Sequence, residues 1–101
     1  MRLARQGEVD CPGEVIFVED DGSYVALSRV QDRAGTTPWI HDLVVLGDDR
    51  TAAVRLLLKA REQIREWGFD SFLANVQADS EIMGMMIQKF KIEQVIFRGD
   101  A

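Results

Sequence analysis

The strongest constraint on the fold is an apolar strand that runs almost directly into the longest amphipathic helix of the chain. Residues 39–46 end in four apolar residues without alternation, which is typical of a strand covered on both faces. After Gly47, Asp48 or Asp49 can cap a helix, and Gly68 can end it. The apolar stripe of this helix comprises Ala53, Leu57, Ala60, Ile64 and Trp67, widened by Val54 and Leu58.

A further strand follows this helix at residues 69–76. Because a strand, a helix and a strand in this order form a right-handed crossover, we expect residues 39–46 and 69–76 to lie parallel in one sheet. In such sheets ligands bind at the carboxyl ends of the strands, where helix N-termini point. The turn after Leu46 is therefore the natural place for a ligand site.

The residues before this unit predict a β-hairpin. Residues 15–18 and 24–30 have strand composition, and the Asp-Gly turn at residues 20–23 between them is a strong hairpin signal. Residues 32–38 have the composition of a loop. The first three strands therefore form an antiparallel meander that leads into the crossover.

Beyond residue 76 the sequence predicts one more helix and one more strand. Asp79 or Ser80 would cap the helix, and residues 94–98 would form the strand. The apolar face of the helix would carry Ile82, Met83, Met86, Ile87 and Phe90. The predicted order is β-β-β-α-β-α-β, an α/β (α+β) fold with a mixed sheet flanked by helices. We assign residues 1–13 to an N-terminal lead-in and residues 14–101 to a single domain.

Composition narrows the class of protein. Apolar residues make up 47% of the 101 residues and charged residues 29%, which is ordinary for a folded domain. The apolar runs are too short for a membrane span or a signal peptide, so we expect a cytoplasmic protein. A formal net charge of −5 disfavours nucleic-acid binding, because phosphate contacts need a positive field. Cys11 is the single cysteine, which excludes an internal disulfide and a multi-thiolate zinc site.

The order of elements and two short segments resemble the GNAT family of N-acetyltransferases. In that family the strand corresponding to residues 39–46 leads into a helix through a loop of pattern Gln/Arg-x-x-Gly-x-Gly/Ala, whose backbone N–H groups hold the pyrophosphate of acetyl-coenzyme A. Here Arg50 matches the opening residue, whereas Ala53 and Arg55 occupy the two small-residue positions. The resemblance implies a cofactor-binding set of Val44, Val45, Leu46, Arg50, Ala52, Ala53, Val54, Arg55 and Asn75.

The second segment lies in the predicted C-terminal half. Asn75-Val76 and the run Ile87-Gln88-Lys89-Phe90 follow the rhythm of the family, but Ile87 stands where many members carry a general-acid tyrosine. Relative to the family fold, the chain is expected to be truncated at both ends. We expect it to lack the usual N-terminal strand and helices, and the last strand.

Transfer of an acyl group from coenzyme A to an amine needs a base for the ammonium of the acceptor and an acid for the leaving thiolate. His41 is the single histidine, and with Asp42 it lies on a strand that the family often uses for catalysis. Successive strand residues point to opposite faces, so at most one of these two faces the cleft. Tyr24 is a candidate acid. The acidic residues of the 20–23 turn are expected to serve the turn, so no metal site is predicted.

Two classes of function remain open from the sequence. The first is a GNAT-like acyl-coenzyme A-dependent N-acyltransferase domain, with acetyl-coenzyme A and an unknown amine as its ligands. The second is a non-catalytic GNAT-fold module that binds a protein partner or a second copy through an unpaired sheet edge. Bacteriophage proteins, including virion-associated ones, are a plausible setting for the second class.

Overall fold

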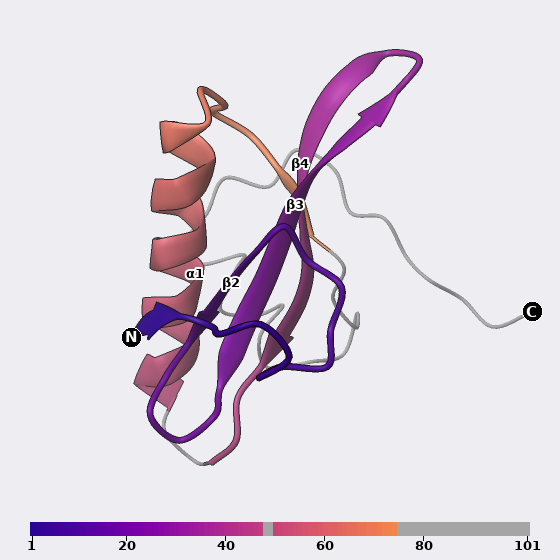
Figure 1. The fold of residues 1–101 in the computed structure, drawn as a ribbon. Coiled ribbons are helices and arrows are strands. Elements are labelled where there is room, and N and C mark those ends of the chain that lie inside the picture. The colour runs from indigo at the N-terminus through magenta and orange to yellow at the C-terminus, as the bar shows by residue number, and fades with distance from the viewer. Residues whose placement is uncertain (48–49, 75–101) are drawn as a thin grey trace, which may run out of the picture.

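The computed structural model of the chain describes residues 1–47 and 50–74, which form a mixed sheet with one long helix packed on one face (Figure 1). The described part therefore has a mixed α+β architecture. Its elements in chain order are β1 (Arg2–Leu3), β2 (Val15–Val18), β3 (Tyr24–Asp32), β4 (Gly35–Val44), α1 (Arg50–Glu66) and β5 (Leu73–Ala74).

The strands lie side by side in the order β1-β2-β3-β4-β5. The first three neighbouring pairs are antiparallel, and β4 pairs with β5 in parallel through Trp39↔Leu73 and Ile40↔Ala74. The predicted parallel crossover through α1 is thus confirmed. The described strand β5 is shorter than the predicted 69–76. The expected helix at 82–90 and strand at 94–98 lie outside the described residues.

The first hairpin has the predicted turn. The N–H of Gly22 donates to the carbonyl of Glu19 at 3.0 Å, and the N–H of Glu19 donates to the carbonyl of Ser23 at 2.8 Å. Gly22 has a φ of 92°, a left-handed conformation that favours glycine. Asp21 accepts a 2.9 Å hydrogen bond from the N–H of Ser23 through Oδ1, and this bond lowers the pKa of the Asp21 carboxyl. Asp21 therefore serves the turn, as the composition indicates.

The predicted loop at residues 32–38 is wrong. β3 and β4 continue as a paired hairpin arm to Asp32↔Gly35, and Figure 1 shows this arm extending beyond the rest of the sheet. Asp32 accepts a 2.8 Å hydrogen bond from the N–H of Ala34, which closes a tight turn. Turn-forming residues were present in the sequence, but they span only the tip, and Thr36 and Thr37 continue the strand.

The lead-in also contributes to the sheet. No strand was predicted within residues 1–13, yet β1 pairs with β2 through Arg2↔Val18 and Leu3↔Phe17. Two residues are too few to show a strand periodicity in the sequence, and only the neighbouring edge of β2 defines this one.

Helix α1 covers one face of the sheet and forms the core with it. Leu56, Leu57, Ala60 and Ile64 are buried against Phe17, Val25, Leu27 and Ile40 of the strands. The predicted stripe is confirmed at Ala53, Leu57, Ala60 and Ile64, but Leu58 is 48% exposed and Leu56 is fully buried in its place. Leu56 and Leu58 flank Leu57 in sequence, and only the direction from which the sheet approaches decides which one is covered.

The helix ends as the glycine predicts. Gly68 has a φ of 95°. Its N–H donates to the carbonyl of Arg65 at 2.9 Å, and the N–H of Phe69 donates to the carbonyl of Ile64 at 3.1 Å. These two bonds make a Schellman motif, which satisfies carbonyls that the helix leaves without partners.

Candidate functional site

Three polar side chains meet on the face of the sheet opposite α1. Val25 and Leu27 of β3 face the core, so Tyr24 and Ala26 face the other side. Asp42 pairs with Ala26 across β3 and β4, and therefore shares this face. The lead-in brings Cys11 to the same place. Tyr24, Asp42 and Cys11 form the polar cluster discussed below.

The polar cluster is centred on the carboxylate of Asp42. The phenol of Tyr24 donates a hydrogen bond of 3.2 Å to Oδ2 of Asp42. The thiol of Cys11 lies 3.8 Å from the same oxygen and 3.6 Å from the carbonyl of Pro12. All three residues are half-buried. One carboxylate thus accepts from two weak acids, which is a stable arrangement while both acids keep their protons.

The environment keeps both protons in place. Burial and the nearby charge of Asp42 raise the pKa of Tyr24 to about 12. The same two causes raise the pKa of the Cys11 thiol. A general acid works best with a pKa near the working pH, and a nucleophilic thiol needs a lowered one. In this arrangement Tyr24 is a hydrogen-bond donor that ionises only at high pH, and Cys11 is a neutral thiol.

His41 occupies a β-bulge on β4. Ala26 pairs with Asp42 and Leu27 pairs with Ile40, so His41 is an extra residue of β4 without a pairing partner on β3. Bulges locally re-aim side chains and are frequent next to active sites. The hydrogen bonds of the polar cluster join Tyr24 and Cys11 to Asp42. Tyr24 and Asp42 are together, and His41 is half-buried at the adjacent position.

The end of β4 is tied to the first hairpin by a buried serine. Ser23 is fully buried, and its hydroxyl accepts a 2.9 Å hydrogen bond from the backbone N–H of Leu46. The side chain of Leu46 is 55% exposed, whereas Val44 and Val45 are half-buried. One of the backbone donors that the resemblance assigns to a cofactor is thus already bonded within the protein.

Most of the remaining residues of the predicted cofactor-binding set lie in the first turns of α1. Ala52 and Ala53 are buried against the sheet, at 2% and 3% exposure. Arg55 points to the hairpin turn, where its Nε donates to Oε1 of Glu19 at 3.0 Å and its Nη1 lies 2.8 Å from the hydroxyl of Thr51. Val54 is half-buried. The side chain of Arg50, and Asn75 as a whole, lie outside what the structure describes.

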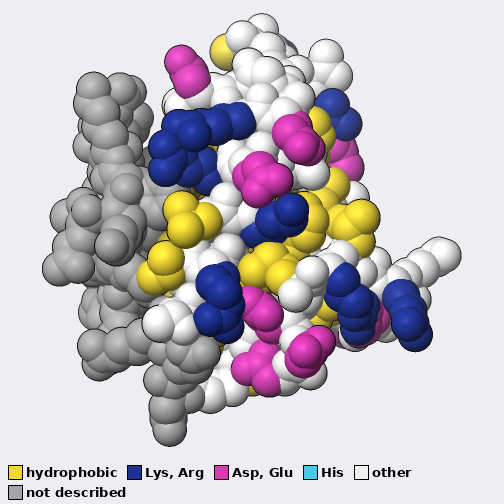
Figure 2. Space-filling view, turned by 90° about the vertical axis from the view of Figure 1, so that its left-hand side faces the viewer, with side chains coloured by type: hydrophobic (Ala, Val, Ile, Leu, Met, Phe, Trp, Pro, Cys, Tyr) yellow, Lys and Arg dark blue, Asp and Glu magenta, His cyan; other side chains and the backbone are white. Residues whose placement is uncertain are grey.

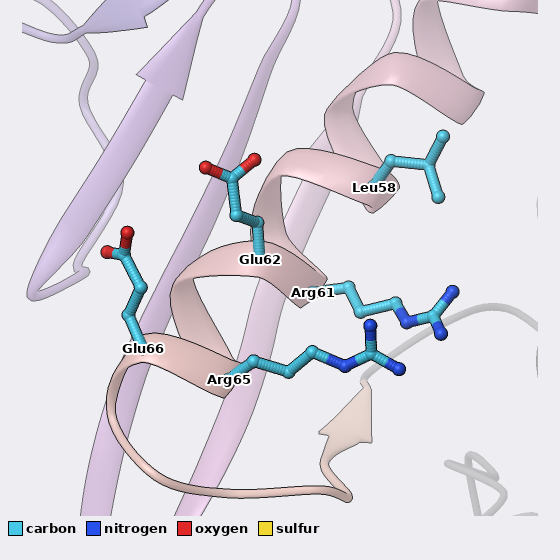
Figure 3. Close-up of a pocket in the computed structure, with 5 residues that line it drawn as sticks. All are labelled: Leu58, Arg61, Glu62, Arg65 and Glu66. Carbon is cyan, nitrogen blue, oxygen red and sulfur yellow. The ribbon is translucent and has the colours of Figure 1, made fainter.

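The outer face of α1 carries a shallow hollow of about 410 Å³ lined by Leu58, Arg61, Glu62, Arg65 and Glu66. Figure 3 shows the two glutamates pointing to one side of the helix and the two arginines to the other. On the surface around it, Figure 2 shows Lys and Arg side chains interspersed with Asp and Glu. A single helix with mixed charges lines this hollow, and none of the predicted site residues lies in it.

Sequence reasoning missed two members of this region, Cys11 and Ser23. Cys11 is 31 positions from Asp42 in the chain, and only the path of the lead-in brings the two together. Ser23 had a local signal, because a serine that follows Asp-Gly in a hairpin commonly bonds to nearby backbone groups. Its particular partner, Leu46, follows from the pairing of β3 with β4.

Within residues 1–47 and 50–74, no group of three or more His, Cys, Asp or Glu side chains is arranged to hold a metal ion. The same part of the chain contains no helix with the length and apolarity needed to cross a lipid bilayer. Comparison with models of known protein families, with curated proteins and with solved structures found no match.

Proposed function

We propose that the chain is a GNAT-like, acyl-coenzyme A-dependent N-acyltransferase domain whose ligand site lies at the carboxyl end of β4. The observation that carries the proposal is the β4–α1–β5 unit, in which a bulged strand runs through a turn into a long helix beside a parallel strand. Ligands of such units bind at this end of the sheet, where the backbone N–H groups of the first helical turn have no partners within the helix.

The local charges are compatible with an anionic ligand at α1. The first turn of α1 contains no acidic residue, and it begins with Arg50. A Cβ built on Gly47 would meet nothing within 4 Å, so the backbone at this residue is open to close approach. Acyl-coenzyme A would supply the activated acyl group, while Asp42 or His41 would receive a proton from an acceptor ammonium.

A second candidate is a non-catalytic module of the same fold that binds a protein partner or a second copy. Two contacts and one pKa favour it. Ser23 occupies the N–H of Leu46, Arg55 is engaged with Glu19, and the high pKa of Tyr24 opposes proton donation. In addition, Asp48 and Asp49 directly precede the helix in the sequence, and their negative charges would repel a diphosphate.

Calorimetric titration with acetyl-coenzyme A and with coenzyme A tests the first candidate. We expect micromolar binding that Arg50→Ala weakens by about 10- to 100-fold, because one charge-assisted hydrogen bond contributes about 1.5–3 kcal/mol. Arg65→Ala is the matched control, since Arg65 lies in the last turn of the same helix, and it should leave the affinity unchanged. Absence of heat at millimolar ligand would exclude the N-acyltransferase proposal.

Light scattering after size exclusion tests the second candidate. Self-association through a sheet edge predicts a dimer or a larger assembly at micromolar concentration. A chain that stays strictly monomeric, and that binds no coenzyme A, would contradict both the first candidate and the self-associating form of the second.

A further inference from the structure

Residues 4–13 cross the face of the sheet that α1 leaves uncovered, and we call this segment the strap (Figure 1). It is attached at both ends by backbone hydrogen bonds. At the start the N–H of Ala4 donates to the carbonyl of Ile16 at 2.8 Å, and just after the end the N–H of Glu14 donates to the carbonyl of Leu27 at 3.0 Å. Between these points the strap carries Cys11 over the polar cluster.

The strap approaches the sheet closely at Gly13. A Cβ built on Gly13 would lie 3.2 Å from Cβ of Ala26 and 3.2 Å from Cγ1 of Ile16. Ala26 is fully buried although its side chain faces away from the core under α1. The absence of a side chain at Gly13 and the small one at Ala26 therefore allow the strap to pack on β3 beside Asp42.

The middle of the strap is held by the contacts of Glu8. Glu8 accepts a 2.7 Å hydrogen bond from Nη1 of Arg2 and a 2.9 Å bond from the N–H of Arg5. The N–H of Glu8 donates to the carbonyl of Arg5 at 3.0 Å. These exposed contacts shape the strap into a compact turn and tie it through Arg2 to the edge strand β1, not to the strands β3 and β4 that carry the polar cluster. Over the polar cluster the attachment rests on a thiol, which is a weak donor.

This division of contacts lets the strap move while β2, β3 and β4 stay paired beneath it. Segments with few buried apolar contacts open at a much lower free-energy cost than the core that they cover. The elements beneath the strap are held independently, because β2, β3 and β4 pair with one another along their lengths and pack against α1.

We infer that the strap is a cover for Tyr24 and Asp42, and that it lifts from the sheet as a unit to open this face to a substrate. The strap closes the face by setting the Cys11 thiol against Asp42 and Gly13 against Ala26. When it lifts, Asp42 loses the thiol, and its oxygen becomes available to an ammonium donor. This role as a gate for an acceptor amine rests on the proposed N-acyltransferase function, whereas the movement itself does not.

The chain supplies two natural reporters, because it contains one cysteine and one tyrosine. The rate at which Cys11 reacts with a disulfide reagent at constant pH measures the opening of the strap. The absorbance of the phenolate measures the pKa of Tyr24. In the native protein we expect slow thiol labelling relative to the urea-unfolded chain, and a Tyr24 pKa of about 12.

Gly13→Val should hold the strap off the sheet, because the added side chain meets Ala26 and Ile16. We expect thiol labelling to accelerate by about tenfold or more, and the Tyr24 pKa to fall toward its ordinary value of 10.0. Ala34→Val adds similar bulk in the exposed β3–β4 turn and should change neither reading. Circular dichroism establishes that each variant is folded. Should Gly13→Val fail to fold, thiol labelling and the Tyr24 pKa are measured on the smaller Gly13→Ala, with changes expected in the same directions.

Two results would overturn the inference. One is native Cys11 reacting as fast as in the unfolded chain, and the other is a folded Gly13 variant with native labelling and a native Tyr24 pKa. Neither measurement uses coenzyme A. Failure of the calorimetric titration would therefore remove the proposed function and leave a lifting strap established, whereas failure of the labelling test would leave the coenzyme A site standing.

Discussion

The hydroxyl of Ser23 accepts a 2.9 Å hydrogen bond from the backbone N–H of Leu46, at a position where the serine is fully buried. This bond fastens the exit of β4 to the turn of the first hairpin. It also fixes the start of the connection that leads into α1, the segment in which a ligand site is proposed.

Ser23→Ala should therefore destabilise the fold. The substitution leaves the N–H of Leu46 without its partner, and an unsatisfied donor costs about 1–3 kcal/mol. Urea unfolding followed by circular dichroism measures this loss. The matched control is Ser71→Ala, because Ser71 is exposed, and its effect should stay within about 0.5 kcal/mol. Equal effects of the two substitutions would show that the buried bond contributes nothing.

Leu56 and Leu58 provide a test of the core under α1. Leu56 is fully buried and Leu58 is 48% exposed, although both lie on the same helix two positions apart. Leu56→Ala should lower the free energy of unfolding by about 2–5 kcal/mol, as expected for a cavity in a packed core. Leu58→Ala should change it by less than about 0.5 kcal/mol. A larger loss for Leu58 than for Leu56 would contradict the orientation of α1 described above.

The pKa of Tyr24 predicts a loss of stability in alkali. Folding raises this pKa from 10.0 to about 12, so the neutral phenol is favoured in the folded state. The resulting stabilisation is complete below about pH 10 and is lost as the pH rises through about 12. Urea midpoints at several alkaline pH values measure this loss. Tyr24→Phe removes the ionisable group and should give a shallower decline over the same range. Parallel declines for the two proteins would argue against the contact with Asp42.

The ion pair of the strap predicts a change at acidic pH. The hydrogen bonds from Arg2 and from the N–H of Arg5 lower the pKa of Glu8 from 4.5 to about 2. Its contribution to stability is present above pH 4.5 and is lost as the pH falls through about 2. Carboxyl chemical shifts measure the pKa directly. Arg2→Ala should return it most of the way to 4.5, and Arg33→Ala, in the exposed arm, should leave it unchanged. A native Glu8 pKa near 4.5 would show that this pair does not form.

Local signals in the sequence were sufficient for several elements of this fold. The Asp-Gly turn predicted the β2–β3 hairpin, and the strand–helix–strand order predicted that β4 and β5 are parallel. Gly68 predicted the end of α1 through the left-handed conformation that its Schellman motif needs. These features depend on a few neighbouring residues whose backbone preferences agree with the final structure, which is why they can be recognised without a tertiary context.

Contacts between distant segments decided the rest. The loop composition of residues 32–38 did not reveal that β3 and β4 stay paired to the tip, because the pairing partner matters more there than composition. The candidate site shows the same limit. Tyr24 and Asp42 were both singled out, but their hydrogen bond depends on the register of β3 and β4.

The sequence by itself therefore determined the kinds and the order of the elements from β2 to β5. Those properties arise from residue spacing and from turn chemistry, which act over a few positions. Only the tertiary structure decided that Leu56 is buried and Leu58 exposed, that Arg55 pairs with Glu19, and that the lead-in sets Cys11 against Asp42. Each of these depends on which surfaces meet when α1 and the lead-in pack on opposite faces of one sheet, and no local pattern in the chain specifies that meeting.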